Sequence, residues 1–260
     1  MIDINKEISA IEGKSKLAVI LGSGLSPSGD EKSVHKLISY SDIGILPVPT
    51  AKGHPGIIFL FERLDGSCVY LFAGRSHLYE GVSREQAAAG VDLASKLGCR
   101  KVLFVNTAGS LTSRVPLESW FIPSDLMAFP FNYGGHKGIN GYRRDYCPAP
   151  LISDSFRKEV ITAAMEASIH TYEGTLMWNV GPCYETCTEA SAVAELGADA
   201  VTMSILPELI ESSDKNIETA ILSRVTNYTP NVNRRSVSHD EVIRSGKKAK
   251  KMLFRILSGL

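Results

Sequence analysis

Short apolar runs recur along the chain at the length typical of β-strands. They occupy residues 17–21, 57–64, 68–73, 101–105, 120–127, 171–180, 200–203 and 219–226. Asp65-Gly66 separates two of these runs and predicts a β-hairpin. Segments 28–50 and 129–150 have no regular pattern, and the length of the second predicts a functional loop.

Helical spacing fills most of the gaps between the predicted strands. It covers residues 2–11, 83–98, 153–168 and 186–196, a segment from 207, and a C-terminal helix that ends near 257. Three of these helices open on capping boxes, Ser83 with Gln86, Thr186 with Glu189 and Ser238 with Glu241. The alternation predicts an α/β protein: one domain over residues 1–260, an α/β/α sandwich around a central mixed, twisted sheet.

Charge and composition narrow the classes of partner. Lysine and arginine balance aspartate and glutamate at 28 each, which argues against nucleic-acid or membrane-surface binding. The lysines at 247–251 fit a solvated helix face better than a binding patch. The five cysteines form no CxxC and the six histidines show no metal-binding spacing, so we expect a reducing compartment and no metal site. No signal peptide or membrane span is evident, and the expected location is the cytoplasm.

Polar residues stand beside small ones where several predicted strands end. Ser23 lies in Gly22–Ser26, Arg75 and His77 lie in the loop 74–81, and Ser204 follows the run 200–203. Hydroxyl, guanidinium and imidazole donors at strand ends suit an oxyanion. Taken singly, the loops at 22–26 and 74–81 fit a tight or solvated turn better than an anion site, and Pro27 rules out the GxGxxG dinucleotide fingerprint.

A second pair of strand-end residues suits a heterocycle. Glu185 offers a carboxylate and Asn227 offers an amide, which together match a ring edge that has both N–H donors and carbonyl acceptors.

Eight motifs carry a family resemblance and follow one another over nearly the whole chain. They are LGSGLS (21–26), GHPG (53–56), GRSHLYEG (74–81), NTAGSL (106–111), EGTLMWNVGPCYET (173–186), GADAVTMS (197–204), TN (226–227) and HDEV (239–242). In these motifs the chain resembles the trimeric purine nucleoside phosphorylases and the related 5′-methylthioadenosine phosphorylases. The resemblance implies the nucleoside phosphorylase fold.

The resemblance also implies roles for individual residues. The implied phosphate site comprises Ser23, Arg75, His77, Thr107 and Ser204, with His54 as a histidine near the entrance. The implied purine site comprises Ala108, Gly109, Tyr184, Glu185, Val201, Met203 and Asn227. Tyr79, Met203 and His239 would meet the ribose, and Asn227, Glu185 and His77 would be the catalytic residues.

The implied reaction is reversible phosphorolysis of a purine nucleoside, giving the free purine and ribose or deoxyribose 1-phosphate, in purine salvage. It uses inorganic phosphate as co-substrate and needs no metal or organic cofactor. In the family, Asp at position 227 accompanies 6-aminopurines, so Asn227 with Glu185 and His239 predicts the 6-oxopurine nucleosides inosine and guanosine. A homotrimer is implied, in which Tyr133 or Phe131 of a neighbouring subunit approaches the ribose.

Some residues depart from the family pattern and other functions stay open. Thr107 and Thr202 stand where smaller residues are expected, and Tyr184 stands where Phe is common. The alternatives are a phosphorylase for 6-amino or methylthio nucleosides, a nucleoside hydrolase and an inactive nucleoside-binding protein.

Overall fold

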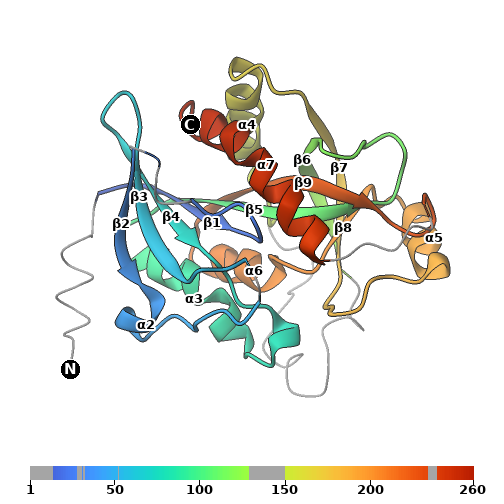
Figure 1. Cartoon of the computed structure of the whole chain (residues 1–260), viewed down its shortest axis with the longest axis horizontal. Helices are drawn as coiled ribbons and strands as arrows, with labels where there is room; N and C mark the ends of the chain where they lie inside the picture. The colour runs from blue at the N-terminus through green and yellow to red at the C-terminus, as the bar shows by residue number, and fades with distance from the viewer. Residues whose placement is uncertain (1–13, 28–30, 32, 52, 129–149, 234–238) are drawn as a thin grey trace.

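A nine-stranded mixed sheet forms the centre of the described chain (Figure 1). The computed structural model describes residues 14–27, 31, 33–51, 53–128, 150–233 and 239–260, with the backbone alone for His239. The strands are β1 (Leu17–Leu21), β2 (Val34–Ser39), β3 (Ile57–Glu62), β4 (Cys68–Ala73), β5 (Lys101–Ser110), β6 (Trp120–Met127), β7 (Thr171–Trp178), β8 (Ala200–Thr202) and β9 (Glu218–Tyr228). Their order is β2-β3-β4-β1-β5-β8-β7-β6-β9.

One half of the sheet closes on itself. β1 runs parallel to both β4 and β5, and β5 also pairs in parallel with β9 along ten residue positions from Lys101 to Ser110. Because β9 in turn pairs with β6, the strands β5, β8, β7, β6 and β9 form a continuous ring. The predicted mixed sheet is confirmed, and this closure is a feature that strand patterns alone do not reveal.

Helices cover both faces of the sheet. They are α2 (Tyr40–Ile43), α3 (Arg84–Lys96), α4 (Asp154–Glu166), α5 (Cys187–Glu195), α6 (Leu206–Asp214) and α7 (His239–Leu257), with one 3₁₀ turn, η1 (Leu78–Glu80). Figure 1 shows α3 and α6 on one side, α4 and α7 on the other, and α5 at the far end of the closed half. This arrangement confirms the predicted α/β class.

The sequence of β1 shows why its strand is apolar throughout. Ala18 and Ile20 belong to the hydrophobic core that includes α3 and α6, whereas Val19 and Leu21 belong to the core that includes α4 and α7. Alternate side chains point to opposite faces of a strand, so a strand covered on both faces is apolar at successive positions unless its polar groups find hydrogen-bond partners. Each such Val, Ile or Leu contributes about 1.5–3 kcal/mol on burial.

Local signals placed several elements correctly. Ser83 and Thr186 accept from the backbone N–H of Gln86 and Glu189, which confirms two capping boxes, while Ser238 lies outside the described residues. β3 and β4 pair antiparallel on either side of Asp65-Gly66, as the hairpin signal predicts. The segments 2–11 and 129–149 lie outside the described residues.

Two expectations about strands were wrong. Segment 28–50 was expected to be irregular but contains β2 and α2; a register shift between Lys36 and Ile38 breaks the alternation that reveals a strand. β5 and β9 continue past their expected ends, so Asn106, Thr107 and Asn227 lie within strands and are not in the loops after them. Pairing between β5 and β9 supplies the backbone hydrogen bonds that extend both strands.

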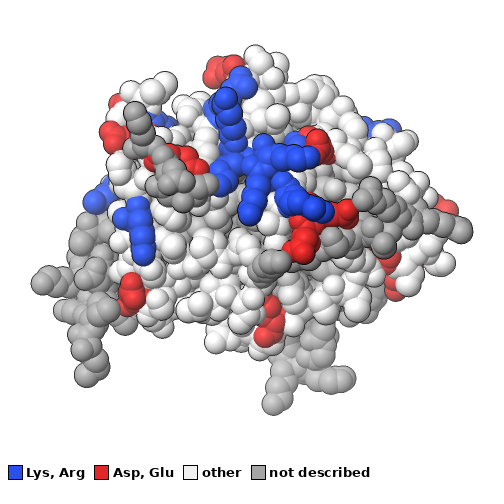
Figure 2. Space-filling view, viewed as in Figure 1, with Lys and Arg blue, Asp and Glu red and all other residues white. Residues whose placement is uncertain are grey.

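The exposed surface of α7 is basic, and one of its lysines lies close to an acidic side chain. Figure 2 shows Lys and Arg side chains gathered over this helix. Lys247, Lys248 and Lys251 are exposed, and Lys248 Nζ lies 3.5 Å from Glu118 Oε1. In the described part of the chain, every helix is too short or too polar to span a lipid bilayer.

The buried side of α7 touches the glycine-rich loop after β1. A Cβ atom added to Gly246 would lie 2.7 Å from the backbone oxygen of Ser23, and Gly24 has φ +77° beside Ile243. Neither glycine therefore has room for a side chain, and α7 determines where the loop that carries Ser23 lies.

Gly246→Ala should destabilise the protein despite the higher helix propensity of alanine. The helix propensity of alanine would stabilise the folded protein by about 1 kcal/mol. Overpacking of the new methyl group against the Ser23 backbone costs about 1–3 kcal/mol, and more where that backbone cannot move. Urea unfolding should show a net loss, whereas Lys251→Ala on the exposed face should change the free energy of unfolding by less than about 0.5 kcal/mol. A Gly246→Ala protein as stable as the parent would contradict the close contact.

Candidate active site

The strand ends of the closed half surround a cavity of about 90 Å³. β5, β8, β9, α7 and the loops after β1, β4 and β7 all contribute to it. Its lining consists of Gly22, Ser23, His77, Tyr79, Asn106, Thr107, Ala108, Gly109, Tyr184, Glu185, Val201, Thr202, Met203, Ser204, Thr226, Asn227 and Val242.

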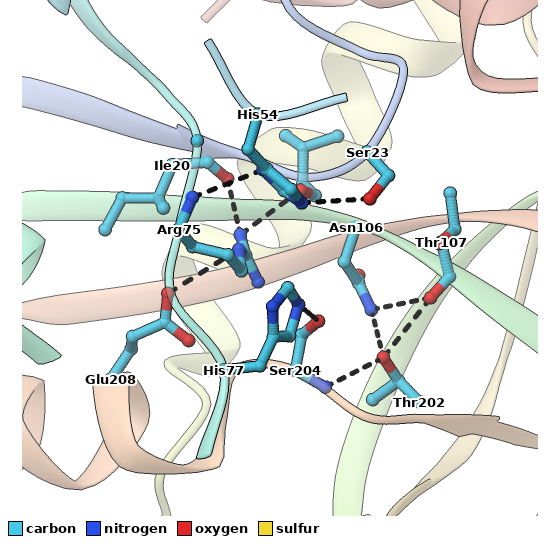
Figure 3. A network of polar contacts seen from close by, with 12 residues as sticks. Ile20, Ser23, His54, Arg75, His77, Asn106, Thr107, Thr202, Ser204 and Glu208 are labelled. Carbon is cyan, nitrogen blue, oxygen red and sulfur yellow. Dashed lines mark hydrogen bonds and ion pairs between the residues drawn. The ribbon is translucent and has the colours of Figure 1, made fainter. Parts of the chain in front are cut away.

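Ser23, His77 and Ser204 line one end of this cavity, and His54, which is not part of the lining, bonds to Ser23 (Figure 3). Ser23 Oγ lies 2.9 Å from His54 Nε2, and His77 Nε2 lies 3.1 Å from Ser204 Oγ. The two imidazole rings meet edge to face with centroids 5.5 Å apart. Hydroxyl and imidazole groups at this spacing provide donors for one small anion.

Glu80 determines which ring nitrogen of His77 faces the cavity. Its Oε1 lies 2.9 Å from His77 Nδ1 and also accepts from the His77 backbone N–H at 2.7 Å. A carboxylate only accepts, so Nδ1 carries a proton and Nε2 faces the cavity. A neutral His77 accepts from Ser204 through Nε2, and a protonated one donates to an anion.

Glu80 also forms hydrogen bonds with the segment that precedes His54. Its Oε2 accepts from the backbone N–H groups of Thr50 and Ala51, at 2.9 and 3.2 Å, and from the Thr50 hydroxyl. Burial alone would raise the pKa of Glu80, but hydrogen bonds from His77 and Thr50 outweigh burial and hold it well below its usual range.

Arg75 lies behind the cavity wall. Its Nη2 donates to the backbone oxygens of Ile20 at 2.8 Å and Val105 at 3.3 Å, and its side chain is 1% exposed. It borders a separate cavity of about 20 Å³ between the sheet and α6, together with Tyr40 and Glu208. The guanidinium therefore does not line the main cavity, and its direct contact with phosphate stays a prediction.

Glu208 of α6 is the buried counter-charge of Arg75. Its Oε1 lies 3.7 Å from Arg75 Nε, and its side chain is 4% exposed. Burial raises the pKa of Glu208, while the positive charge of Arg75 opposes the rise. A buried guanidinium without such a partner would cost several kcal/mol in desolvation.

A network within the sheet holds Thr107 and Ser204 in place. Asn106 Nδ2 donates to Thr202 Oγ1 at 2.8 Å and to the Thr107 backbone oxygen at 3.1 Å. The Thr202 hydroxyl in turn accepts from the Ser204 backbone N–H at 3.3 Å. Ser223 donates to Asn106 Oδ1 at 2.8 Å and fixes the orientation of that amide.

The opposite end of the cavity has a carboxylate and an amide. Glu185 is 7% exposed, and its Oε1 accepts from Asn179 Nδ2 at 2.9 Å. Asn227 pairs with Gly109 next to a register shift in the β5–β9 ladder, and a Cβ on Gly109 would lie 3.0 Å from Asn227 Nδ2. The amide therefore has room only because position 109 is glycine.

Tyr79 and Met203 also line the cavity. The Tyr79 ring stacks on His77 with centroids 4.8 Å apart and planes 15° apart, and burial raises the pKa of Tyr79 to about 12. A Cβ on Gly181 would lie 2.7 Å from Met203 Sδ and 2.9 Å from Tyr79 Cδ1, so this glycine allows both side chains to approach. Tyr184 is 47% exposed at the rim.

The structure thus brings most of the predicted site residues to one cavity. They are Ser23, His77, Tyr79, Thr107, Ala108, Gly109, Tyr184, Glu185, Val201, Met203, Ser204 and Asn227. Arg75 and His54 lie one layer behind, in contact with each other through Arg75 N and His54 Nδ1 at 3.3 Å. The side chain of His239, and all of Tyr133 and Phe131, lie outside the described residues.

Comparison with known proteins identifies the family of the chain. The model of the phosphorylase superfamily matches residues 16–260. Purine nucleoside phosphorylase 1 of Geobacillus stearothermophilus is 31% identical over 258 residues, which cover 94% of this chain and 90% of the relative. The chain belongs to the purine nucleoside phosphorylase family.

Solved structures of the family share the fold. Schistosoma mansoni purine nucleoside phosphorylase in complex with adenosine superposes with a TM-score of 0.81 at 26% identity, over 99% of this chain and 97% of the other. A Schistosoma purine nucleoside phosphorylase in complex with guanosine gives a TM-score of 0.80 at 25% identity, over 99% and 96%.

Sequence reasoning missed several residues that hold the cavity-lining side chains in place. Glu80 stands three residues after His77 in the GRSHLYEG motif, a spacing that itself indicates contact within one turn. Asn106 and Thr202 are adjacent to predicted site residues, but their contact joins two strands 96 positions apart. Glu208 and Asn179 gave no local signal, because each acts on a residue from another part of the fold.

Glu80→Gln should remove a stabilisation that depends on pH. The folded-state pKa of Glu80 lies below its unfolded value of about 4.3, so its charge stabilises the fold above that pH. The stability difference between the parent and Glu80→Gln should stay constant above about pH 6 and shrink as the pH falls below about 4. Urea unfolding at several pH values measures it, with Glu166→Gln on the outer face of α4 as control; a difference equally large at pH 3 would contradict the assignment.

Proposed function

We propose that the chain catalyses phosphorolysis of 6-oxopurine nucleosides, inosine and guanosine, to the free purine and ribose or deoxyribose 1-phosphate. The relatives of the chain show that it is an enzyme of the purine nucleoside phosphorylase family. The choice of base and the role in purine salvage are the proposed part.

One observation supports the proposal above the others. Ser23, His77 and Ser204 line the same cavity as Glu185 and Asn227, and Tyr79 and Met203 also line it. A nucleoside with phosphate has matching parts: an anion, a sugar with a broad apolar face, and a base with a polar edge.

At the anion end, Ser23, His77, Ser204 and the backbone of Thr107 would hold the phosphate. Arg75 adds positive charge from behind these residues, and its fixed position requires no reorganisation during reaction. A phosphate oxygen attacks C1′ of the sugar while the bond from C1′ to the purine nitrogen breaks. The phosphate is then both nucleophile and counter-charge for the positive charge that develops on the sugar.

At the base end, the departing purine gains negative charge. Asn227 would donate its amide N–H to the ring as electrons arrive, and Glu185 would accept from N1–H of a 6-oxopurine. In the described structure Asn227 Nδ2 donates weakly to the Tyr228 backbone oxygen at 3.3 Å, and Oδ1 accepts from Thr226 at 3.0 Å. The weaker of these bonds is the one the base would replace.

A 6-amino nucleoside is the second candidate substrate. The Schistosoma neighbour binds adenosine in one structure and guanosine in another. An amide can turn to present its oxygen to a 6-amino group, but Glu185 then lacks the N1–H that it would accept. This unpaired carboxylate favours 6-oxopurines.

The proposal includes further expectations from the family resemblance. They are a homotrimer in which Tyr133 or Phe131 reaches a neighbouring site, His239 beside the ribose, a cytoplasmic location, and a reaction without metal or organic cofactor.

Release of hypoxanthine from inosine should require inorganic phosphate and should be unaffected by EDTA. The same assay with guanosine, adenosine and methylthioadenosine should give kcat/KM values that are higher for the two 6-oxopurines. Release without phosphate would indicate a hydrolase, release from none of the four would indicate a binding protein, and a higher value for methylthioadenosine than for inosine would refute the base assignment.

Asn227→Ala should lower kcat/KM for inosine at least tenfold, equal to about 1.4 kcal/mol of transition-state stabilisation. Asn227→Asp has nearly the same shape and should lower kcat/KM for inosine further, because its carboxylate repels a 6-oxo group. The kcat/KM for adenosine should rise relative to that for inosine, because the carboxylate accepts from a 6-amino group. Steady-state kinetics with both nucleosides measures this; near-parental inosine turnover by Asn227→Ala would contradict the role.

A further inference from the structure

Asn179 lies behind the carboxylate that faces the base. It follows β7 directly, and its backbone N–H donates to the Thr202 oxygen at 2.8 Å, so its position is fixed by the end of β8. Its side-chain Nδ2 donates to Glu185 Oε1 at 2.9 Å. Asn179 itself does not line the cavity, so it reaches Glu185 from outside the wall.

This contact makes the two oxygens of Glu185 unequal. Glu185 is 7% exposed and, among the residues that the structure describes, its side chain bonds to Asn179 alone. Oε1 already accepts a hydrogen bond from Asn179, and the planar carboxylate cannot rotate without breaking that bond. Oε2 is therefore the oxygen with its full accepting capacity.

The bases differ in how many donors they present to a carboxylate. Along the edge that Glu185 would meet, hypoxanthine presents one N–H, at N1, whereas guanine presents N1–H and an adjacent amino group. One donor needs one free oxygen, but two parallel donors need both oxygens in a bidentate arrangement. Asn179 competes with the bond from the guanine amino group, whereas the bond from N1–H can use the other oxygen.

We propose that Asn179 is a specificity-determining residue that orients Glu185 and favours hypoxanthine nucleosides over guanine nucleosides. The inference rests on the proposed function, because it assigns Glu185 to the N1 edge of the base. The side-chain bond of Asn179 goes to Glu185, whereas its link to the network around Ser204 runs through its backbone N–H and the Thr202 oxygen, which side-chain substitutions leave in place.

Asn179→Leu tests this with nearly the same side-chain shape and no donor, and Asn179→Ala tests it with a smaller side chain. Freed from Asn179, Glu185 can offer both oxygens, so the ratio of kcat/KM for guanosine to that for inosine should rise about three- to tenfold in both variants, the range of one hydrogen bond. The change should fall on KM more than on kcat, because the bond is present in the bound substrate.

Calorimetric binding of free hypoxanthine and guanine gives a second readout that does not depend on turnover. The guanine-to-hypoxanthine affinity ratio should rise by the same factor in both variants. Asn231→Leu is the matched control, because it removes an amide that donates to the Leu111 oxygen at 3.0 Å and leaves Glu185 untouched, so neither ratio should move.

The outcomes separate the two proposals. Parental protein that binds both bases but releases neither from its nucleoside would refute the phosphorylase function, while the affinity ratios still test Asn179. Ratios within twofold of the parental ones in folded Asn179→Leu and Asn179→Ala proteins, or a shift toward hypoxanthine, would overturn the role of Asn179 and leave the phosphorylase function standing.

Discussion

The guanidinium of Arg75 joins the segments that build the anion end of the cavity. It bonds to the backbone of β1 at Ile20 and of β5 at Val105, and it faces Glu208 on α6. Ser23 follows β1, Thr107 lies on β5, and Ser204 precedes α6. A fully buried cation that satisfies carbonyl groups of two strands therefore also fixes the relative positions of three residues that would meet phosphate.

Charge at this end is arranged in opposing pairs. Arg75 faces Glu208, and His77 faces Glu80, so each of these two basic groups has its own carboxylate. Such pairing keeps two basic groups buried in the absence of an anion, which would otherwise be costly. It also fixes the imidazole orientation, because Glu80 holds Nδ1 and leaves Nε2 toward Ser204.

The base end is organised by backbone irregularity and by support from outside the cavity. The register shift in the β5–β9 ladder lies beside Gly109, where the absence of a side chain makes room for the Asn227 amide. Glu185 comes from the loop between β7 and α5 and is held by Asn179 of the same loop. The two groups that we propose to meet the base are thus positioned by different elements, so one can be altered without moving the other.

Local sequence signals determined much of the fold. Apolar runs, capping residues and the Asp-Gly turn specify β1, β3, β4, α3 and α5, because the interactions that form these elements lie within a few residues. The motifs at strand ends likewise identified most of the residues that line the cavity. The tertiary structure alone decided the closure of the sheet, the extension of β5 and β9, and the inward turn of Arg75, since each depends on partners far away in sequence. The supporting contacts of Asn106, Asn179 and Glu208 belong to the same group, because a residue that acts through another has no local pattern until folding brings the two together.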